Sequence, residues 1–357
     1  MPDATAALVA AGLPVGKLAP DLLGHLLRAI GDEDQSLLVG PGVGRDAAAI
    51  RFGEVVLVVK TDPITFASHD AASYLVDINA NDVACLGARP RWLLVTALLA
   101  PGTTEQQVEE LFNALLIACE RRGIRLVGGH TEITTGLDRT LLIGSLLGET
   151  TVERLLRPGG ANIGDRLLLT KGLAIEGTAL LAKELQRPLT RLIGEKWVEQ
   201  AGHLLADPGI SVVADAERLL TVGGVTALHD PTEGGLATGI RELAAASNCG
   251  ALLEFRRIPI LPETAAICDA LAINPLGLLA SGSLLVACQL DAVGPLIKAS
   301  LAAGVSLTEI GELISADQGC LLRRGEVVCT LPEFPIDEAN RVLDAQAERS
   351  TGKDDAP

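Results

Sequence analysis

The sequence predicts a two-domain protein in which both halves mix strands and helices, of class α/β or α+β. At 357 residues the chain exceeds the usual size of a single hydrophobic core. Strand-like and helix-like segments alternate along it, and the densest Pro/Gly stretch between them is RPGGANIGDR at 157–166. We therefore expect one domain at 1–156, a second at 157–342 and a polar, disordered tail at 343–357.

The first domain begins with a helix over 18–30, LAPDLLGHLLRAI, where apolar residues recur at helical spacing after a proline and an aspartate. A second helix, over 103–122, has signals at both ends: Thr103 and Gln106 match a capping box, and Gly123 matches a C-cap. The other elements expected here are strands at 36–39, 47–51, 54–60, 92–99, 124–128 and 139–148, and a helix at 70–87.

The second domain resumes the alternation of strands and helices. LLLTKG at 167–172 has the pattern of a strand, and a helix is expected over 234–247, after a pair of glycines. The other expected elements are strands at 225–229, 251–256, 283–289 and 307–313, and helices at 174–187, 195–206, 211–221, 262–271 and 290–303.

Composition excludes several classes of partner. The net charge of −16 disfavours nucleic acid, whose binding needs clustered Lys and Arg. The longest apolar runs, such as WLLVTALLA at 92–100, are too short to cross a membrane, and no basic cluster precedes an early apolar run, so we expect a cytoplasmic protein without a signal peptide. The seven cysteines form no CxxC pair and no zinc-like group, and most are expected to be buried thiols.

Three aspartates in the first half lie beside glycine-rich or strand-like segments. Asp46 follows GPGVGR, Asp62 follows VLVVKT, and Asp82 lies in INANDVACLGARP. Gathering carboxylates near a protein interior is costly unless a cation or a proton neutralises them. Magnesium prefers oxygen ligands and often binds together with substrate phosphates, which glycine backbone N–H groups can contact. The pattern therefore predicts a magnesium–nucleotide site, although neither a Walker A loop nor a GxGxxG motif is present.

Seven short motifs follow one another between about residues 36 and 315: GVGRDAAAI, KTDPIT, NANDVACLGARP, VGGHTEIT, GDRLLLTKG, HDPTEGGLATGI and SGSLL. In this order and spacing they resemble the family of aminoimidazole ribonucleotide (AIR) synthetase. Its relatives include selenophosphate synthetase, thiamine-monophosphate kinase and the hydrogenase-maturation factor HypE. The chain is most similar to the AIR synthase-related, HypE-like branch.

The resemblance implies a PurM-like fold, in which an N-terminal α/β domain forms a homodimer through its sheet and precedes a C-terminal α+β domain. It also implies that ATP lies in the groove between the domains. By motif match, Asp46, Asp62 and Asp82 would hold Mg²⁺ on the polyphosphate, and Asp230 of HDPTEGG would reach the same metal from the second domain. The alternative for Asp62 and Asp230, each followed by proline, is a simple turn.

Further nucleotide contacts are expected by the same match. Gly42 and Gly44 would belong to a phosphate loop, or form a tight turn. Asn81 would orient the metal ligands or the ribose, or cap a helix. Two more glycines, together with a hydroxyl donor to phosphate or ribose, come from VGGHTEIT; they are Gly128, Gly129 and Thr131.

Candidates for the chemistry itself are fewer. His130 could act as a general acid or base, or be a structural hydrogen-bonding residue. Glu132 and Glu233 are candidates for the acceptor site. Lys171 could neutralise phosphate charge or be an ordinary solvated lysine at a strand end.

The resemblance to HypE has a departure at the C-terminus, where the HypE reaction uses a terminal cysteine. The present chain reads GKDDAP there, and Cys329 precedes it in an expected strand. We therefore expect magnesium-ATP-dependent phosphoryl transfer to an oxygen of a small molecule or an acyl or carbamoyl group, without chemistry on a terminal thiol. The alternative is a nucleotide-binding scaffold or regulator of a maturation pathway without turnover. A third reading treats the aspartates as turn formers only.

Overall fold

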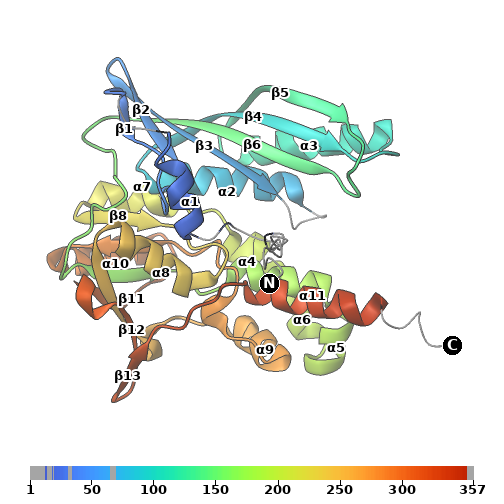
Figure 1. The fold of residues 1–357 in the computed structure, drawn as a ribbon. Helices are drawn as coiled ribbons and strands as arrows, with labels where there is room; N and C mark the ends of the chain where they lie inside the picture. The colour runs from blue at the N-terminus through green and yellow to red at the C-terminus, as the bar shows by residue number, and fades with distance from the viewer. Residues whose placement is uncertain (1–12, 14–17, 19, 31–33, 65–69, 352–357) are drawn as a thin grey trace, which may run out of the picture.

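The structure is a computed structural model that describes residue 13, residue 18 and residues 20–30, 34–64 and 70–351. Figure 1 shows two layers, each built on one β-sheet, with helices between and around them. In the described residues, no helix is long and apolar enough to span a lipid bilayer.

The first layer contains a sheet with the strand order β1-β2-β3-β6-β4-β5. All neighbouring strands are antiparallel except β4 and β5, which are parallel. Helices α2 and α3 pack against one face of this sheet (Figure 1). The elements are α1 (Pro20–Leu27), β1 (Leu37–Val39), β2 (Ala48–Phe52), β3 (Val55–Ile64), α2 (Ala71–Cys85), β4 (Arg89–Leu99), α3 (Glu105–Arg121), β5 (Arg125–Ile133) and β6 (Leu141–Thr150).

The second layer contains a sheet with the strand order β13-β12-β9-β11-β7-β10-β8, in which only β12 and β9 are parallel neighbours. Its strands are β7 (Arg166–Thr170), β8 (Val225–His229), β9 (Cys249–Glu254), β10 (Leu285–Cys288), β11 (Leu307–Ser315), β12 (Cys320–Arg324) and β13 (Val327–Thr330). Its helices are α4 (Ile175–Glu184), α5 (Gln186–Ile193), α6 (Glu195–His203), α7 (Val213–Val222), α8 (Gly235–Ala246), α9 (Pro262–Leu271), α10 (Val293–Ala302) and α11 (Glu338–Thr351). Short helical turns are η1 (Leu205–Gly209), η2 (Phe255–Arg257), η3 (Pro275–Gly277), η4 (Leu290–Ala292) and η5 (Ala316–Gln318).

Helix α2 joins the two layers, because it contacts the first sheet on one side and α7 and β8 on the other. Its sequence, AASYLVDINANDVAC, is rich in small and apolar residues, and most of its side chains are buried. A helix enclosed on all sides is expected to be apolar all round. The polar residues Asp77, Asn79, Asn81 and Asp82 are exceptions, and each needs a partner inside the protein.

The mixed α/β character of both halves is confirmed, and several boundaries change. Strand β3 continues through Asp62 to Ile64 instead of ending at residue 60. The capping box of α3 is formed by Thr104 and Gln107, one residue later than predicted. The connection between the two sheets runs from residue 151 to 165, and we propose that the domain boundary at 156/157 lies within it.

The expected disordered tail at 343–357 is wrong for residues 343–351, which belong to helix α11. Val342 and Leu343 pack against the core of the second layer, so burial of apolar side chains stabilises the beginning of this helix. The remaining residues, 352–357, lie outside the described residues.

Candidate functional site

A pair of buried aspartates lies where the two layers meet. Asp82 is carried by α2 of the first layer, and Asp230 follows β8 of the second; they are 5% and 3% exposed. Burial, together with the charge of Asp46, raises the pKa of Asp82 to about 6 against the opposing effect of Lys60. Burial and the charges of Asp82 and Asp46 raise the pKa of Asp230 well above its usual range. Each carboxylate therefore needs a positive charge or a proton close by.

The glycine loop brings Asp46 to the same place. Asp46 Oδ2 lies 3.7 Å from Nδ1 of His229, whose Nε2 lies 3.0 Å from Oε2 of Glu242 on α8. Burial lowers the pKa of His229, but Glu242, Asp46 and Asp82 outweigh it, and the net shift is upward. His229 of the second layer thus connects Asp46 to α8. This contact holds the loop between β1 and β2 against the other half of the molecule.

Asp62 joins the cluster through a lysine of its own strand. Lys60 Nζ lies 2.7 Å from Oδ2 of Asp82 and 3.5 Å from Oδ2 of Asp62. Burial lowers the pKa of Lys60, but the carboxylates of Asp82, Asp62 and Asp46 raise it by more, so this ammonium remains charged. The four aspartates predicted as metal ligands are therefore brought together, and Lys60 lies among them.

A solvent-open cleft lies beside this cluster. Asp46, Asp82, Gly44 and His229 line it on the side of the cluster. Cys85, one helical turn beyond Asp82, also lines the cleft, and its Sγ lies 3.5 Å from Oδ1 of Asp230. The rest of the lining comes from Leu86, Leu156, Arg157, Pro158, Gly159, Ala227, Leu228, Leu243, Ala246 and Ser247.

The donor set fits magnesium by its chemistry. The carboxylates of Asp46, Asp62, Asp82 and Asp230 supply the oxygen ligands that this ion prefers. Oδ2 of Asp230 is buried and has no hydrogen-bond partner within the described structure, which leaves an oxygen available for a cation. In the arrangement observed, however, no three His, Cys, Asp or Glu side chains of the described chain converge on one metal position. The close contact of Lys60 with Asp82 gives a reason for this.

Gly42 and Gly44 lie in the loop that carries Asp46. Gly44 has a φ of 72°, which favours glycine, and its Cα faces the backbone of Glu242 on α8. At Gly42 a side chain would meet the side chain of Arg45 at 2.8 Å. The backbone conformation therefore favours glycine at Gly44, which also lines the cleft, whereas at Gly42 the flexible Arg45 side chain could move aside.

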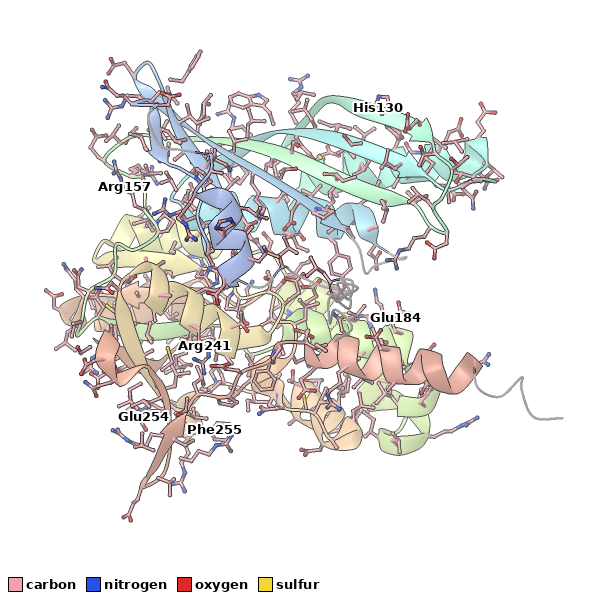
Figure 2. All side chains as sticks on the ribbon, viewed as in Figure 1. His130, Arg157, Glu184, Arg241, Glu254 and Phe255 are labelled. Atoms are coloured by element: carbon pink, nitrogen blue, oxygen red, sulfur yellow. The ribbon has the colours of Figure 1, made fainter. Side chains whose placement is uncertain are left out.

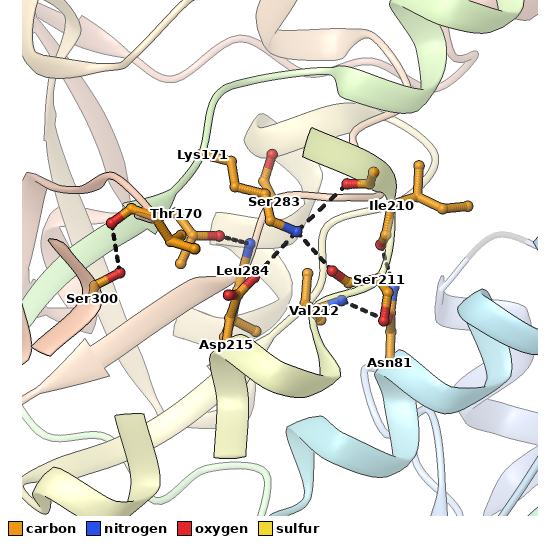
Figure 3. Close-up of polar contacts among 12 residues, drawn as sticks. Asn81, Thr170, Lys171, Ile210, Ser211, Val212, Asp215, Ser283, Leu284 and Ser300 are labelled. Atoms are coloured by element: carbon orange, nitrogen blue, oxygen red, sulfur yellow. Dashed lines mark hydrogen bonds and ion pairs between the residues drawn. The ribbon is translucent and has the colours of Figure 1, made fainter. Parts of the chain in front are cut away.

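Asn81 and Lys171 have structural partners in place of the nucleotide contacts predicted for them (Figure 3). Asn81 donates from Nδ2 to the carbonyl of Ile210 at 2.9 Å and accepts from the backbone N–H of Val212 at 2.8 Å. Lys171 Nζ donates to the carbonyl of Ser211 at 2.6 Å, and burial lowers its pKa. Because both the nitrogen and the oxygen of the Asn81 amide bind the backbone at 210–212, its assignment to the metal or ribose is corrected to a structural role between the layers.

The second contact of Lys171 completes this correction. Its ammonium also lies 3.1 Å from Oδ2 of Asp215 on α7. The side chain is 7% exposed, so it is not the solvated lysine considered as the alternative either. Lys171 instead binds the segment 210–212, which precedes α7. Asn81 of the first layer binds the same segment.

The motif VGGHTEIT forms β5, at the edge of the first sheet and away from the aspartates. Figure 2 shows His130 on the side of the sheet turned away from the second layer, and its Nε2 lies 3.1 Å from Oε2 of Glu132. Thr131 is exposed on the same strand. At Gly129, with a φ of 147°, a Cβ would lie 1.8 Å from the carbonyl oxygen of Val95, so this glycine is required for pairing with β4.

The motif therefore contributes nothing to the aspartate cluster within one chain. Gly128 has open space around its Cα, and the structure gives Gly128, Gly129, Thr131 and His130 no contact with the cleft. The edge strand that carries them is instead a surface element.

Glu233 belongs to a second group of acids. It lies close enough to Glu176 at the start of α4, and to Asp337, to raise the pKa values of both. Burial is the larger cause and raises the pKa of Glu176 to about 7 and that of Asp337 to about 6. In the described structure, Oε2 of Glu176 and Oγ of Ser281 are buried without hydrogen-bond partners.

We expect Glu176 to make stability pH-dependent. Its folded pKa of about 7 exceeds the unfolded value near 4.5, so the folded protein binds the proton more tightly and loses stability as pH rises from 5 to 8. Glu176→Gln stays neutral, so its stability relative to wild type should increase by roughly 2 kcal/mol between pH 5 and pH 8. Urea unfolding at the two pH values measures this. The exposed Glu199→Gln should show no such change, and equal behaviour of the two variants would contradict the assignment.

Several residues of the site were not predicted from the sequence. Lys60, His229 and Cys85 each lie within two or three residues of a predicted ligand, which is a usable signal. Glu176 gives a weaker signal, namely an acid within the apolar stretch GLAIEGTALLA. Glu176 is buried against the core of the second layer and the loop that carries Ser281. That loop lies far from Glu176 in the sequence, so the sequence alone does not reveal the contact.

Comparisons with known proteins bear on the family and on the fold. The family model for the N-terminal domain of AIR synthase related protein matches residues 44–150, and the model for the C-terminal domain matches residues 162–321. Over 277 residues the chain is 30% identical to the carbamoyl dehydratase HypE of Rhodobacter capsulatus, with 76% of this chain and 78% of that protein covered.

Solved structures share the fold. A HypE structure in complex with ATP matches with a TM-score of 0.68 and 21% identity, covering 88% of this chain and 91% of that one. HypE from a HypE–HypF complex matches with a TM-score of 0.69 and 19% identity, covering 82% and 94%. A ThiL structure with AMPPCP and TMP matches with a TM-score of 0.66 and 19% identity, covering 86% and 94%.

Proposed function

This chain belongs to the AIR synthase-related protein family and is HypE-like within it, and from that premise we propose that it is an ATP-dependent enzyme whose nucleotide binds between the two layers. The expected family and the two-domain PurM-like fold are confirmed. The reaction we propose is transfer of the γ-phosphoryl group to an oxygen of a small molecule, or of an acyl or carbamoyl group.

The observation that carries this proposal is the pair Asp82 and Asp230, two buried carboxylates contributed by different halves of the chain. With Asp46 and Asp62 they form a carboxylate-rich site beside a cleft, where a bound cation would offset charge that Lys60 alone does not balance. Bound magnesium would neutralise polyphosphate charge there. The residues of this chain would hold the ion from both layers, and His229 would keep the glycine loop against α8.

Glu233 remains the candidate for the acceptor end of the groove, now together with Glu176 and Asp337. Glu176 and Asp337 are buried and Glu233 is half-buried, and such a cluster of acids favours an acceptor that donates hydrogen bonds or accepts a proton. His130, Gly128, Gly129 and Thr131 lie on an outer edge strand, so in our proposal they contribute only where two protomers meet.

ATP turnover by the purified protein tests the proposal. ADP release should rise when a carbamoyl compound, an amide or a phosphate ester serves as acceptor in the presence of Mg²⁺. Tight magnesium-dependent ATP binding without turnover under any acceptor would favour the alternative, a scaffold or regulator. Absence of ATP binding would overturn both.

We propose a homodimer formed through the first sheet. Helices α2 and α3 cover one face, whereas the other face presents half-buried apolar side chains, including Leu57, Val59, Ile143 and Leu147, and Figure 1 shows no described helix over it. An uncovered apolar face of this kind marks an interaction surface.

Light scattering should give twice the chain mass of 37.0 kDa. Leu147→Glu lies in the middle of this face and should yield monomers, because a charge there would be buried in the dimer. As a control, Leu301→Glu changes an equally apolar but exposed residue of α10, far from this sheet, and should leave the dimer intact. A wild-type monomer would contradict the dimer.

A further inference from the structure

Lys60 occupies a position where a strand of this kind normally carries an apolar residue. Along β3, the side chains of Val56, Val58 and Ile64 are buried on the inner face, and Lys60 shares that face by strand alternation. It is 9% exposed, whereas lysine is almost never buried without a partner. The inward direction of this ammonium is therefore fixed by the strand register, which pairs Lys60 with Leu146 of β6.

Both ion-pair partners of Lys60 among the described residues are predicted metal ligands. Its Nζ lies 2.7 Å from Oδ2 of Asp82 and 3.5 Å from Oδ2 of Asp62. A divalent cation bound by these carboxylates would compete for the same oxygen atoms. Among the described residues, no three possible ligands lie close enough together to bind one metal ion. Asp82 instead contacts Lys60 directly.

We propose that Lys60 is a built-in counter-cation of the nucleotide site, which keeps free divalent metal from the aspartates and turns to the polyphosphate when a metal–nucleotide complex binds. This inference rests on the proposed function. The ammonium stabilises the carboxylates of Asp82 and Asp62 without nucleotide, and a metal alone must displace it. A nucleotide brings phosphate oxygens that accept the displaced ammonium, so metal and nucleotide bind together. Lys60 is thus a positioning residue that makes metal binding depend on nucleotide.

The experiment compares two affinities in the full-length protein. Mn²⁺ binding without nucleotide is measured by electron paramagnetic resonance, and binding of AMP-PNP with Mg²⁺ is measured by calorimetry. In Lys60→Met we expect Mn²⁺ alone to bind at least tenfold more tightly, because its competitor is gone. We expect AMP-PNP to bind at least tenfold more weakly, because the polyphosphate loses its ammonium partner.

Two further variants make the result decisive. Lys60→Gln removes the charge but can still donate a hydrogen bond to Asp82, so it replaces Lys60→Met if that variant does not fold, and the same opposite shifts are expected. Lys183→Met removes a lysine whose ion pair with Asp70 is at the surface, and neither affinity should change. The proposal would be overturned if the folded Lys60 variant bound Mn²⁺ as wild type does. It would also be overturned if the variant bound both Mn²⁺ and AMP-PNP more weakly than wild type.

If the proposed function itself fails, wild-type protein will not bind AMP-PNP at all. Tighter Mn²⁺ binding by the Lys60 variant would then still show that the lysine excludes metal, whereas the transfer to polyphosphate would be rejected. The two failures are therefore distinguishable.

Discussion

Replacing Asp82 by asparagine should weaken binding of magnesium-ATP at least 100-fold while leaving the protein folded. Asp82 contacts Lys60 and lies beside Asp230, so it is at the centre of the proposed metal site. Asparagine keeps the shape but loses the charge, which removes a metal ligand that binding of the polyphosphate requires. Because burial disfavours the ionised form of Asp82, and Lys60 keeps Asp62 as a partner, the cost in stability should be small. Calorimetric titration with AMP-PNP and urea unfolding measure the two effects.

Asp77→Asn is the matched control on the same helix. Asp77 is equally buried, but both of its oxygens bind Arg122, at 2.5 and 2.9 Å. Loss of this bidentate pair should cost about 2–3 kcal/mol of unfolding free energy and leave nucleotide affinity within a few-fold. The expected pattern is thus reciprocal: Asp82→Asn loses binding, and Asp77→Asn loses stability. Nucleotide affinity unaffected in Asp82→Asn would rule out Asp82 as a metal ligand.

The four aspartates could be predicted because their evidence is local. Each lies in a short motif, and the resemblance of the ordered motifs to the AIR synthetase family implied one site for Asp46, Asp62, Asp82 and Asp230, whose role as metal ligands stays a prediction. The structure brings them together as expected. The alternation of strands and helices likewise predicted the mixed character of both halves, since hydrophobic periodicity is also local.

Side-chain partners that are distant in sequence could not be predicted in this way. Asn81 neighbours Asp82, and proximity in the motif suggested a shared role, yet it points to a backbone segment 129 residues away. Lys171 was similarly assigned by residue type, although its partners come from α7 and the preceding turn. Periodicity indicates which face of an element is buried, whereas the identity of the opposing segment depends on the whole fold.

The second large effect concerns Asn81. Asn81→Ala should lower the free energy of unfolding by about 3 kcal/mol, because it leaves the carbonyl of Ile210 and the N–H of Val212 without their partner between the layers. Each unsatisfied buried backbone group costs about 1–3 kcal/mol, and truncating the side chain adds a cavity. Urea unfolding monitored by circular dichroism measures the loss.

Asn79→Ala separates the contribution of the interlayer bonds from that of truncation. Asn79 lies on the same helix and is as deeply buried, but its Nδ2 donates to Leu75 of its own helix, and its Oδ1 has no partner in the described structure. Its removal orphans no group of the second layer, so it should cost about 2 kcal/mol less than Asn81→Ala. The difference between the two variants is the stabilisation that Asn81 gives to the contact between layers. Equal losses would mean that the backbone at 210–212 finds other partners, and that Asn81 adds no stability to the contact between layers.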